Sequence, residues 1–371
     1  EKLQIKAGYG IFFGSLLFGN GIVAQKLTSG NYNILALPFP FSSLPFTLPG
    51  GRIPESTQLP AGLPFVPQLS LIDRLDPNIR NSYSHQASFG IDYFLNRNTE
   101  FAVNYTLVRG LKIASRRNVN PVVRPIAGDP LTSRLIGRLD PTSGDIGQAA
   151  SAFDSYYHGV TFSATRRLAK GFDLLASYTY SKAIDNVLQV LPTDTRVIDN
   201  PVNALRPGDE RGLSIQDLRH RFVVSGNVAL PLGKNIFLRD YAISFIVTAT
   251  SGRPYNLIAG TDLNMNADDG DRPAGIGRNT GVTPGFTNFD VRLQRLLNFS
   301  DQYKMIFFAE AFNLFNKTNI NPNTIDRVFP PDAQGRFNLP PQENGRFIVT
   351  PDRFRGAFSP RQIQLGFRVL F

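Results

Sequence analysis

Ten short segments of this chain alternate apolar side chains with polar or small ones, and this alternation limits the fold more than any other feature. Because neighbouring side chains of a β-strand point to opposite faces, a two-residue period predicts strands with one apolar face. The last segment, RQIQLGFRVLF, shows the pattern most clearly, with Ile363, Leu365, Phe367, Val369 and Phe371 on one face. These eleven residues are about enough for a tilted strand to cross a bilayer. A half-buried strand of a soluble domain alternates in the same way, so this segment alone leaves both environments open.

The connections between these segments favour the membrane. We expect strands at about residues 2–13, 83–95, 101–107, 160–165, 172–181, 222–230, 241–249, 289–294, 305–311 and 362–371. Connections after the even-numbered strands are turn-sized, whereas those after the odd-numbered strands span about 25 to 70 residues, and the one at 110–154 is expected to be irregular. Bacterial outer-membrane barrels combine short periplasmic turns with long extracellular loops in this way. The sequence therefore predicts an all-β, antiparallel transmembrane β-barrel domain over residues 1–371, with its C-terminus on the periplasmic side.

Composition narrows the alternatives. No stretch approaches eighteen consecutive apolar residues, which argues against a spanning helix. The chain has no cysteine, so a disulfide framework and a thiolate metal site are both excluded. Its net charge of +10 suits anionic lipid headgroups, and because no nucleic-acid-binding motif is present we expect no nucleic-acid partner. Tryptophan is absent, so any aromatic girdle at the membrane interfaces must consist of tyrosine and phenylalanine.

A series of short motifs carries a family resemblance. In order, they are KAGYGIFF, NTEFAVNYTLVRG, SYTYSKAID, DLRHRFVVSGNVALP, TSGRPYN, DRPAGIGRNTG, AEAFNLFNKTN and LGFRVLF. Together they resemble the C-terminal part of Oar-like TonB-dependent outer-membrane receptors. The terminal set Ile363, Leu365, Phe367, Val369 and Phe371 also resembles the signal that the barrel-assembly machinery reads in outer-membrane proteins.

The resemblance implies more than the chain itself contains. Such receptors have a 22-stranded barrel, a plug domain and an inner-membrane energy-coupling partner, and Oar-like members carry a further N-terminal β-sandwich. The chain opens at EKLQIKAGYG without a signal peptide, so we expect that a signal was removed or that Glu1 is not the native start. We expect the chain to be the C-terminal portion of a longer receptor in the outer membrane of a Gram-negative-type bacterium. A closed ten-stranded barrel is the alternative.

Few residues suggest chemistry. The three histidines, His85, His158 and His220, fall in different strands without metal-ligand spacing, and no G-x-S-x-G elbow is present, so we expect neither catalysis nor a cofactor. The oxygen-bearing residues Asp262, Asn264, Asn266 and Asp268 alternate as in a calcium loop. However, Ala267 and Pro273 depart from the EF-hand pattern, so the alternatives are a different Ca²⁺ clamp and a solvated turn.

Two further groups of residues bear on function. Polar side chains lie opposite the apolar stripes of two strands and are candidates for the lumen wall: Asp290, Arg292, Gln294 and Glu310. The Phe- and Pro-rich stretch around 37–67 is expected to pack over the barrel mouth, or else to bind a partner or oligosaccharide. We therefore expect a TonB-dependent-type receptor for an unidentified solute, with outer-membrane lipid and lipopolysaccharide around the barrel. An adhesive or structural barrel and a small barrel enzyme are the alternatives.

Overall fold

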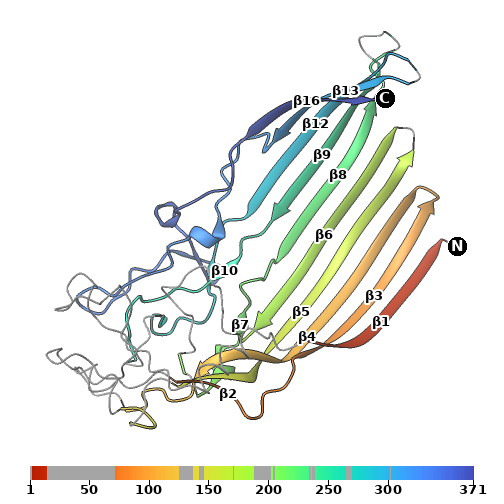
Figure 1. Ribbon diagram of the computed structural model, residues 1–371. Coiled ribbons are helices and arrows are strands. Elements are labelled where there is room, and N and C mark those ends of the chain that lie inside the picture. Colours follow the sequence, from red (N-terminus) through yellow and green to blue (C-terminus); the bar gives the residue numbers. More distant parts are fainter. Residues whose placement is uncertain are drawn as a thin grey trace, which may run out of the picture.

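Long antiparallel strands dominate the computed structural model, which describes residues 2–14, 72–124, 137–141, 146–169, 171–187, 202–203, 205–233, 235, 239–264, 270–300 and 302–371. Ten of them follow one another through a single sheet (Figure 1): β1 (Leu3–Phe13), β3 (Tyr83–Asn96), β4 (Thr99–Asn118), β5 (Ile146–Ala169), β6 (Phe172–Asp185), β8 (His220–Leu230), β9 (Tyr241–Thr250), β12 (Phe286–Asn298), β13 (Lys304–Phe312) and β16 (Gln362–Leu370). Each pairs antiparallel with the next. The predicted all-β antiparallel architecture is confirmed.

The two ends of the sheet differ as the connection lengths predict. Figure 1 shows both termini at the same end as the short turns, with the long connections gathered at the opposite end. In the sheet order, β1 and β16 are the outermost strands, so the described part of the chain forms an open, curved wall.

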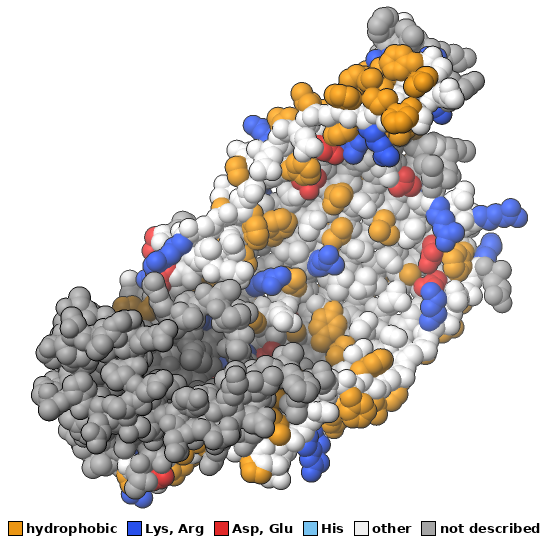
Figure 2. All heavy atoms as spheres, viewed as in Figure 1, with side chains coloured by type: hydrophobic (Ala, Val, Ile, Leu, Met, Phe, Trp, Pro, Cys, Tyr) orange, Lys and Arg blue, Asp and Glu red, His pale blue; other side chains and the backbone are white. Residues whose placement is uncertain are grey.

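The wall has one apolar and one polar face throughout its width. The cross-strand register aligns one apolar row through five strands, formed by Ile5, Ile91, Val103, Phe162 and Tyr178. The neighbouring row on the other face is polar or small, formed by Lys6, Gly90, Asn104, Thr161 and Thr179. Figure 2 looks onto this polar face, where hydrophobic side chains are scattered among polar and charged ones.

The apolar face is exposed to the surroundings of the protein. Ile5 is 62% exposed and Leu365 is 78% exposed, and similar side chains continue across the sheet. Soluble proteins rarely leave a continuous apolar surface of this extent in water. This face is therefore suited to contact with lipid, and the polar face to a water-filled lumen.

Two strands are longer than predicted. The sequence predicts strands at 101–107 and 160–165 separated by an irregular segment at 110–154, but β4 runs to Asn118 and β5 starts at Ile146. Their pairing continues to Asn118 opposite Gly147, with register shifts between Gly110 and Ile113 and between Ile113 and Ser115. The prediction was wrong here because a register shift interrupts the two-residue period and because a strand outside the bilayer needs no apolar face.

The long connections contain structure of their own. A second sheet orders β10 (Pro254–Tyr255), β11 (Gly281–Val282), β15 (Arg346–Ile348) and β14 (Gln342–Glu343). Two further short strands join the main sheet, β2 (Ile72–Leu75) beside β5 and β7 (Gly212–Leu213) beside β6. The described parts of the connections also contain three 3-10 turns: η3 (Pro207–Glu210), η4 (Pro322–Thr324) and η5 (Pro351–Arg353).

Among the described residues, no helix has the length and apolar character that crossing a membrane requires.

Candidate functional site

The four residues predicted to line a lumen all come from β12 and β13 and lie on the polar face. Arg292 and Glu310 are a cross-strand pair whose Nη1 and Oε1 atoms lie 3.3 Å apart. The Arg292 guanidinium also lies 4.2 Å from the centre of the Phe308 ring. Gln294 stands opposite Phe308 in the same ladder, and Asp290 lies nearer the loops. The sheet itself thus holds Arg292 in place, and contact of these residues with a solute stays a prediction.

Asp290 belongs to a network at the base of the last long loop. Its Oδ1 accepts hydrogen bonds from Asn288 Nδ2 at 2.8 Å and from the Asn313 backbone N–H at 2.9 Å. Asn313 has a φ of 49°, a left-handed conformation that asparagine tolerates better than most residues. Its side chain donates to the carbonyls of Lys317 and Ser359 and accepts from the Lys317 N–H. The AEAFNLFNKTN motif therefore joins the end of β13 to the segment that leads into β16.

Asn319 extends this base to β12. Its Oδ1 accepts from the Thr287 N–H at 3.0 Å, and its Nδ2 donates to the Thr287 carbonyl at 2.8 Å. The side chain thus pairs with both backbone groups of one strand residue, as a neighbouring strand would. This contact places the loop residues after Asn319 against the loop end of the polar face.

A cavity of about 690 Å³ opens between these loop residues and the polar face of the sheet. Five strands contribute to its wall, through Arg221, Thr250, Asn288, Phe312 and Gln362. The loops contribute Arg253, several asparagines that include Asn321 and Asn323, and Phe358.

The charged side chains of this cavity differ in whether they form hydrogen bonds with the described residues. Arg221 and Arg253 are exposed, and no described residue forms a hydrogen bond or ion pair with either side chain. The carboxylate of Asp290, in contrast, is hydrogen-bonded to the loop base. The cavity therefore presents two arginines and several amides toward water, a lining suited to a polar or anionic solute.

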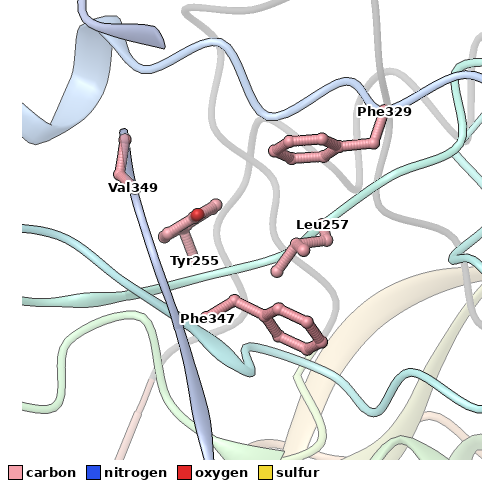
Figure 3. Close-up of a cluster of buried hydrophobic side chains, with 5 residues drawn as sticks. All are labelled: Tyr255, Leu257, Phe329, Phe347 and Val349. Carbon is pink, nitrogen blue, oxygen red and sulfur yellow. The ribbon is translucent and has the colours of Figure 1, made fainter. Parts of the chain in front are cut away.

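A hydrophobic cluster holds the loops around this cavity together. Figure 3 shows its five buried side chains, Tyr255, Leu257, Phe329, Phe347 and Val349, which come from two connections that are far apart in the sequence. We call the structure built on this cluster and the second sheet the loop module. The Tyr255 hydroxyl is buried without a hydrogen-bond partner among the described residues. Burial raises the pKa of Tyr255 to about 12, against the opposing effect of the Arg353 charge.

Two ion pairs join the loop module to the connection between β6 and β8. Arg272 donates to both carboxylate oxygens of Glu210, at 2.7 and 3.0 Å, and the Glu210 side chain is only 2% exposed. Arg278 donates to the Asp185 carboxylate at 2.5 Å and to the carbonyls of Asp185 and Val187. The Arg272–Glu210 pair is bidentate and Arg278 donates to three oxygens, so both contacts are geometrically specific. They set the position of one loop relative to the other.

Sequence reasoning missed these partners although the motifs contain them. Arg272 and Arg278 lie in DRPAGIGRNTG, and Asp185 is the last residue of SYTYSKAID. Asp217 of DLRHRFVVSGNVALP accepts from the Ala183 N–H at 2.6 Å and pairs with Arg219. Residues of three motifs therefore contact partners in other connections, and the available signal was the presence of charged residues within otherwise turn-like motifs.

The predicted calcium segment is only partly described. Asn266 and Asp268 lie outside the described residues, whereas Asp262 and Asn264 are within them. Asp271 accepts from the backbone N–H groups of Leu263 and Asn264 and from Asn264 Nδ2 at 3.0 Å. No group of three metal-binding His, Cys, Asp or Glu residues occurs within the described ranges. The Ca²⁺ site stays a prediction.

All three histidines take part in the same contact on the apolar face. The Tyr9 hydroxyl is 2.6 Å from His85 Nδ1, and the Tyr178 hydroxyl is 2.8 Å from His220 Nδ1. Tyr105 makes the same contact with His158. In each case the tyrosine lies diagonally across from the histidine, on the adjacent strand.

The remaining predicted residues lie at the edge of the sheet or outside the described ranges. The terminal set Ile363, Leu365, Phe367, Val369 and Phe371 is exposed along β16 and just past its end. Its role as an assembly signal stays a prediction. The Phe- and Pro-rich stretch at 37–67 lies outside the described residues.

Comparisons with known proteins agree with this architecture. Residues 1–277 match the family model described as "Outer membrane beta barrel domain". No curated protein matches the chain significantly. Among solved structures, the outer membrane transporter YddB from Escherichia coli is 11% identical with a TM-score of 0.52, and the match covers 100% of this chain and 38% of that one. The FrpB iron transporter from Neisseria meningitidis is 14% identical with a TM-score of 0.41, and the match covers 81% of this chain and 33% of that one. The chain thus spans little more than a third of the length of YddB.

Proposed function

We propose, because this chain belongs to the family of outer membrane beta barrel domains, that it forms part of the wall and the extracellular loops of a receptor that takes up a solute. Family membership places the chain in the outer membrane, with the apolar face toward lipid and the polar face toward the lumen. The fold it shares with an outer membrane transporter supports the uptake function. The finer assignment, to Oar-like TonB-dependent receptors, rests on the order of the sequence motifs.

The cavity at the loop end of the polar face is the observation that carries this proposal. It lies where a solute arriving from outside would first meet the lumen wall, between loop residues and the ends of five strands. Asn313 and Asn319 of its wall are hydrogen-bonded to β12, so part of the binding surface is preorganised. Arg221 and Arg253 give it a positive lining that would suit an anionic solute.

We propose further that the chain is the C-terminal portion of a larger barrel. β1 and β16 end the sheet order, and a sheet edge in lipid must find a partner because its backbone groups have no water to bind. The match to YddB covers the whole of this chain but only 38% of that protein, which is consistent with further strands elsewhere. In this arrangement a plug domain would close the lumen, an inner-membrane energy-coupling protein would act on it, and the barrel-assembly machinery would insert the barrel.

We assign no catalytic function to the chain. Its three histidines are each bound to a tyrosine on the apolar face, away from the cavity. An interfacial role accounts for them without an enzyme.

The proposal can be tested in the bacterium that carries the gene. Depletion of solutes from a defined medium would be compared between a gene deletion and its complemented strain, with and without a protonophore. We expect at least one anionic solute whose depletion requires both the gene and the proton-motive force. If no solute depends on the gene, and the deletion instead reduces attachment to surfaces, the adhesive alternative replaces uptake.

A further inference from the structure

The apolar face carries a cluster of basic and aromatic side chains that the uptake function does not use. The register places His85 directly opposite Arg109, and Arg109 directly opposite Tyr156. One step along the same face, His158 stands directly opposite Lys182. We call these five residues the outer basic patch. It extends across β3, β4, β5 and β6, a width of roughly 14 Å at the usual strand spacing.

No described part of the protein neutralises the positive charges of this patch. Arg109 and Lys182 are exposed, and no described residue forms an ion pair or hydrogen bond with either side chain. Asp154, which precedes His158 on β5, already forms an ion pair with Arg211, whose Nη1 lies 3.0 Å from Asp154 Oδ1. Two cations on a face that otherwise meets hydrocarbon would be costly unless they reach a polar layer with anions.

The patch lies at the level of the outer interface of the membrane. His85 and His158 are each about ten residues from the short-turn end of their strand, and His220 of β8 is at a similar distance. At about 3.3 Å per residue and a tilt of about 40°, ten residues correspond to a height of roughly 25 Å, which is the height of the apolar band of a barrel. The patch therefore lies where headgroups meet acyl chains in the leaflet on the loop side.

The histidines are held in a fixed orientation. Tyr9 and Tyr105 contact Nδ1 of His85 and His158 from the strand on one side. When the tyrosine hydroxyl donates to Nδ1, the ring hydrogen is on Nε2, which can then donate to an external oxygen. The centre of the Tyr156 ring also lies 4.5 Å from that of His158. The patch thus combines two cations with oriented donors and aromatic rings, the groups that bind phosphate oxygens above an apolar surface.

We propose that the outer basic patch is a binding site for the phosphorylated headgroup of a lipid in the outer leaflet. The phosphate would lie between Arg109 and Lys182, and its acyl chains would run down the apolar rows that include Val103 and Phe162. Lipopolysaccharide is expected around the barrel, and the outer basic patch would give this lipid a specific binding site. It is independent of the solute that the lumen carries.

The test uses the full-length protein in a non-ionic detergent. Binding of fluorescent lipopolysaccharide would be compared with binding of the same lipid after removal of its phosphates. We expect the native protein to bind the phosphorylated form about tenfold or more tightly, because each basic side chain at an anionic surface adds to the attraction. Equal binding of the two forms by the native protein would overturn the proposal, whatever happens with the variants.

Variants locate the effect on the protein. The double variant Arg109→Gln/Lys182→Gln is expected to lose the preference for phosphate. The matched control Arg166→Gln/Arg295→Gln removes two cations from the short-turn ends of β5 and β12, where the side chains lie over Phe172 and Tyr241. This control should keep the preference. Heat-dependent gel mobility verifies that each variant is folded.

A third measurement separates a lipid from a free anion. Inorganic phosphate at the lipid's concentration should not displace the lipopolysaccharide, since it lacks the acyl chains. Displacement at that concentration would overturn the assignment to a lipid. A preference for phosphate that the Arg109→Gln/Lys182→Gln variant retains would overturn the location.

Discussion

The ion pair between Glu210 and Arg272 provides the most demanding test of how the loops are held. The Glu210 side chain is 2% exposed and that of Arg272 is 11% exposed, and two hydrogen bonds join them. In the variant Arg272→Met, the carboxylate would keep only the Val202 N–H, at 2.9 Å, as a described donor. Removing one partner of a buried pair costs about 3 to 5 kcal/mol, because the other charge is left uncompensated. The loop module should therefore separate from the β6–β8 connection far more often.

Hydrogen–deuterium exchange of the full-length protein measures this opening directly. At 1.4 kcal/mol for each factor of ten, the loss corresponds to a roughly 100- to 4000-fold rise in exchange for amides in residues 205–214 and 270–281. Exchange in the membrane strands should not change. An increase of less than twofold in Arg272→Met would refute the reasoning that this pair anchors the loops.

Two further variants separate charge burial from the simple loss of a contact. The double variant Glu210→Gln/Arg272→Met also removes the unpaired negative charge of Glu210. Its loop amides should therefore exchange at least about tenfold more slowly than those of Arg272→Met. The matched control is Arg336→Met, which breaks an exposed pair with Asp332 and should change stability by less than about 1 kcal/mol. An effect of equal size in the control would show that burial is not the cause.

Three other predictions concern the loops and the end of the chain. A Cβ at Gly252 would lie 1.6 Å from the Thr283 carbonyl oxygen, so Gly252→Ala should displace the backbone at a cost of about 1 to 3 kcal/mol. Proteolysis of this loop should then be roughly 5- to 100-fold faster, and unchanged proteolysis would contradict the packing. Burial raises the pKa of Asp326, but the hydrogen bond from Arg355 and the other favourable contacts outweigh it, so the net shift is downward from 3.8. The ionised Asp326 carboxylate therefore stabilises the loops fully above its unfolded-state pKa, and this stabilisation is lost as the pH falls through the folded-state pKa. Loop amides should exchange more readily at pH 3 because of this loss, and the effect should be smaller in Asp326→Asn. An identical response to pH in the variant would refute this role of Asp326. Phe371 is 94% exposed, so its deletion should leave the fold intact but reduce outer-membrane assembly of the full-length protein, and normal assembly would count against a terminal signal.

The sequence alone determined the wall of this protein. Alternation with a two-residue period is local information, because each strand between lipid and water must repeat it on its own. The rows that contain Ile5 and Lys6 therefore lie on opposite faces as the pattern predicts, and the lengths of the connections distinguish the two ends of the sheet. For the same reason the faces of Asp290 and Arg292 could be anticipated, although not their partners.

Only the tertiary structure decided what the loops do. Glu210 and Arg272 are 62 residues apart, and no periodicity relates them, because a loop side chain finds its partner only after the strands have placed the loops together. The same holds for the cavity that contains Arg221 and Arg253, whose wall comes from five strands and three connections. The outer basic patch also depends on the cross-strand register, which brings Arg109 beside His85 and Lys182 beside His158. Register depends on how neighbouring strands align, and that alignment is a property of the sheet rather than of any one strand.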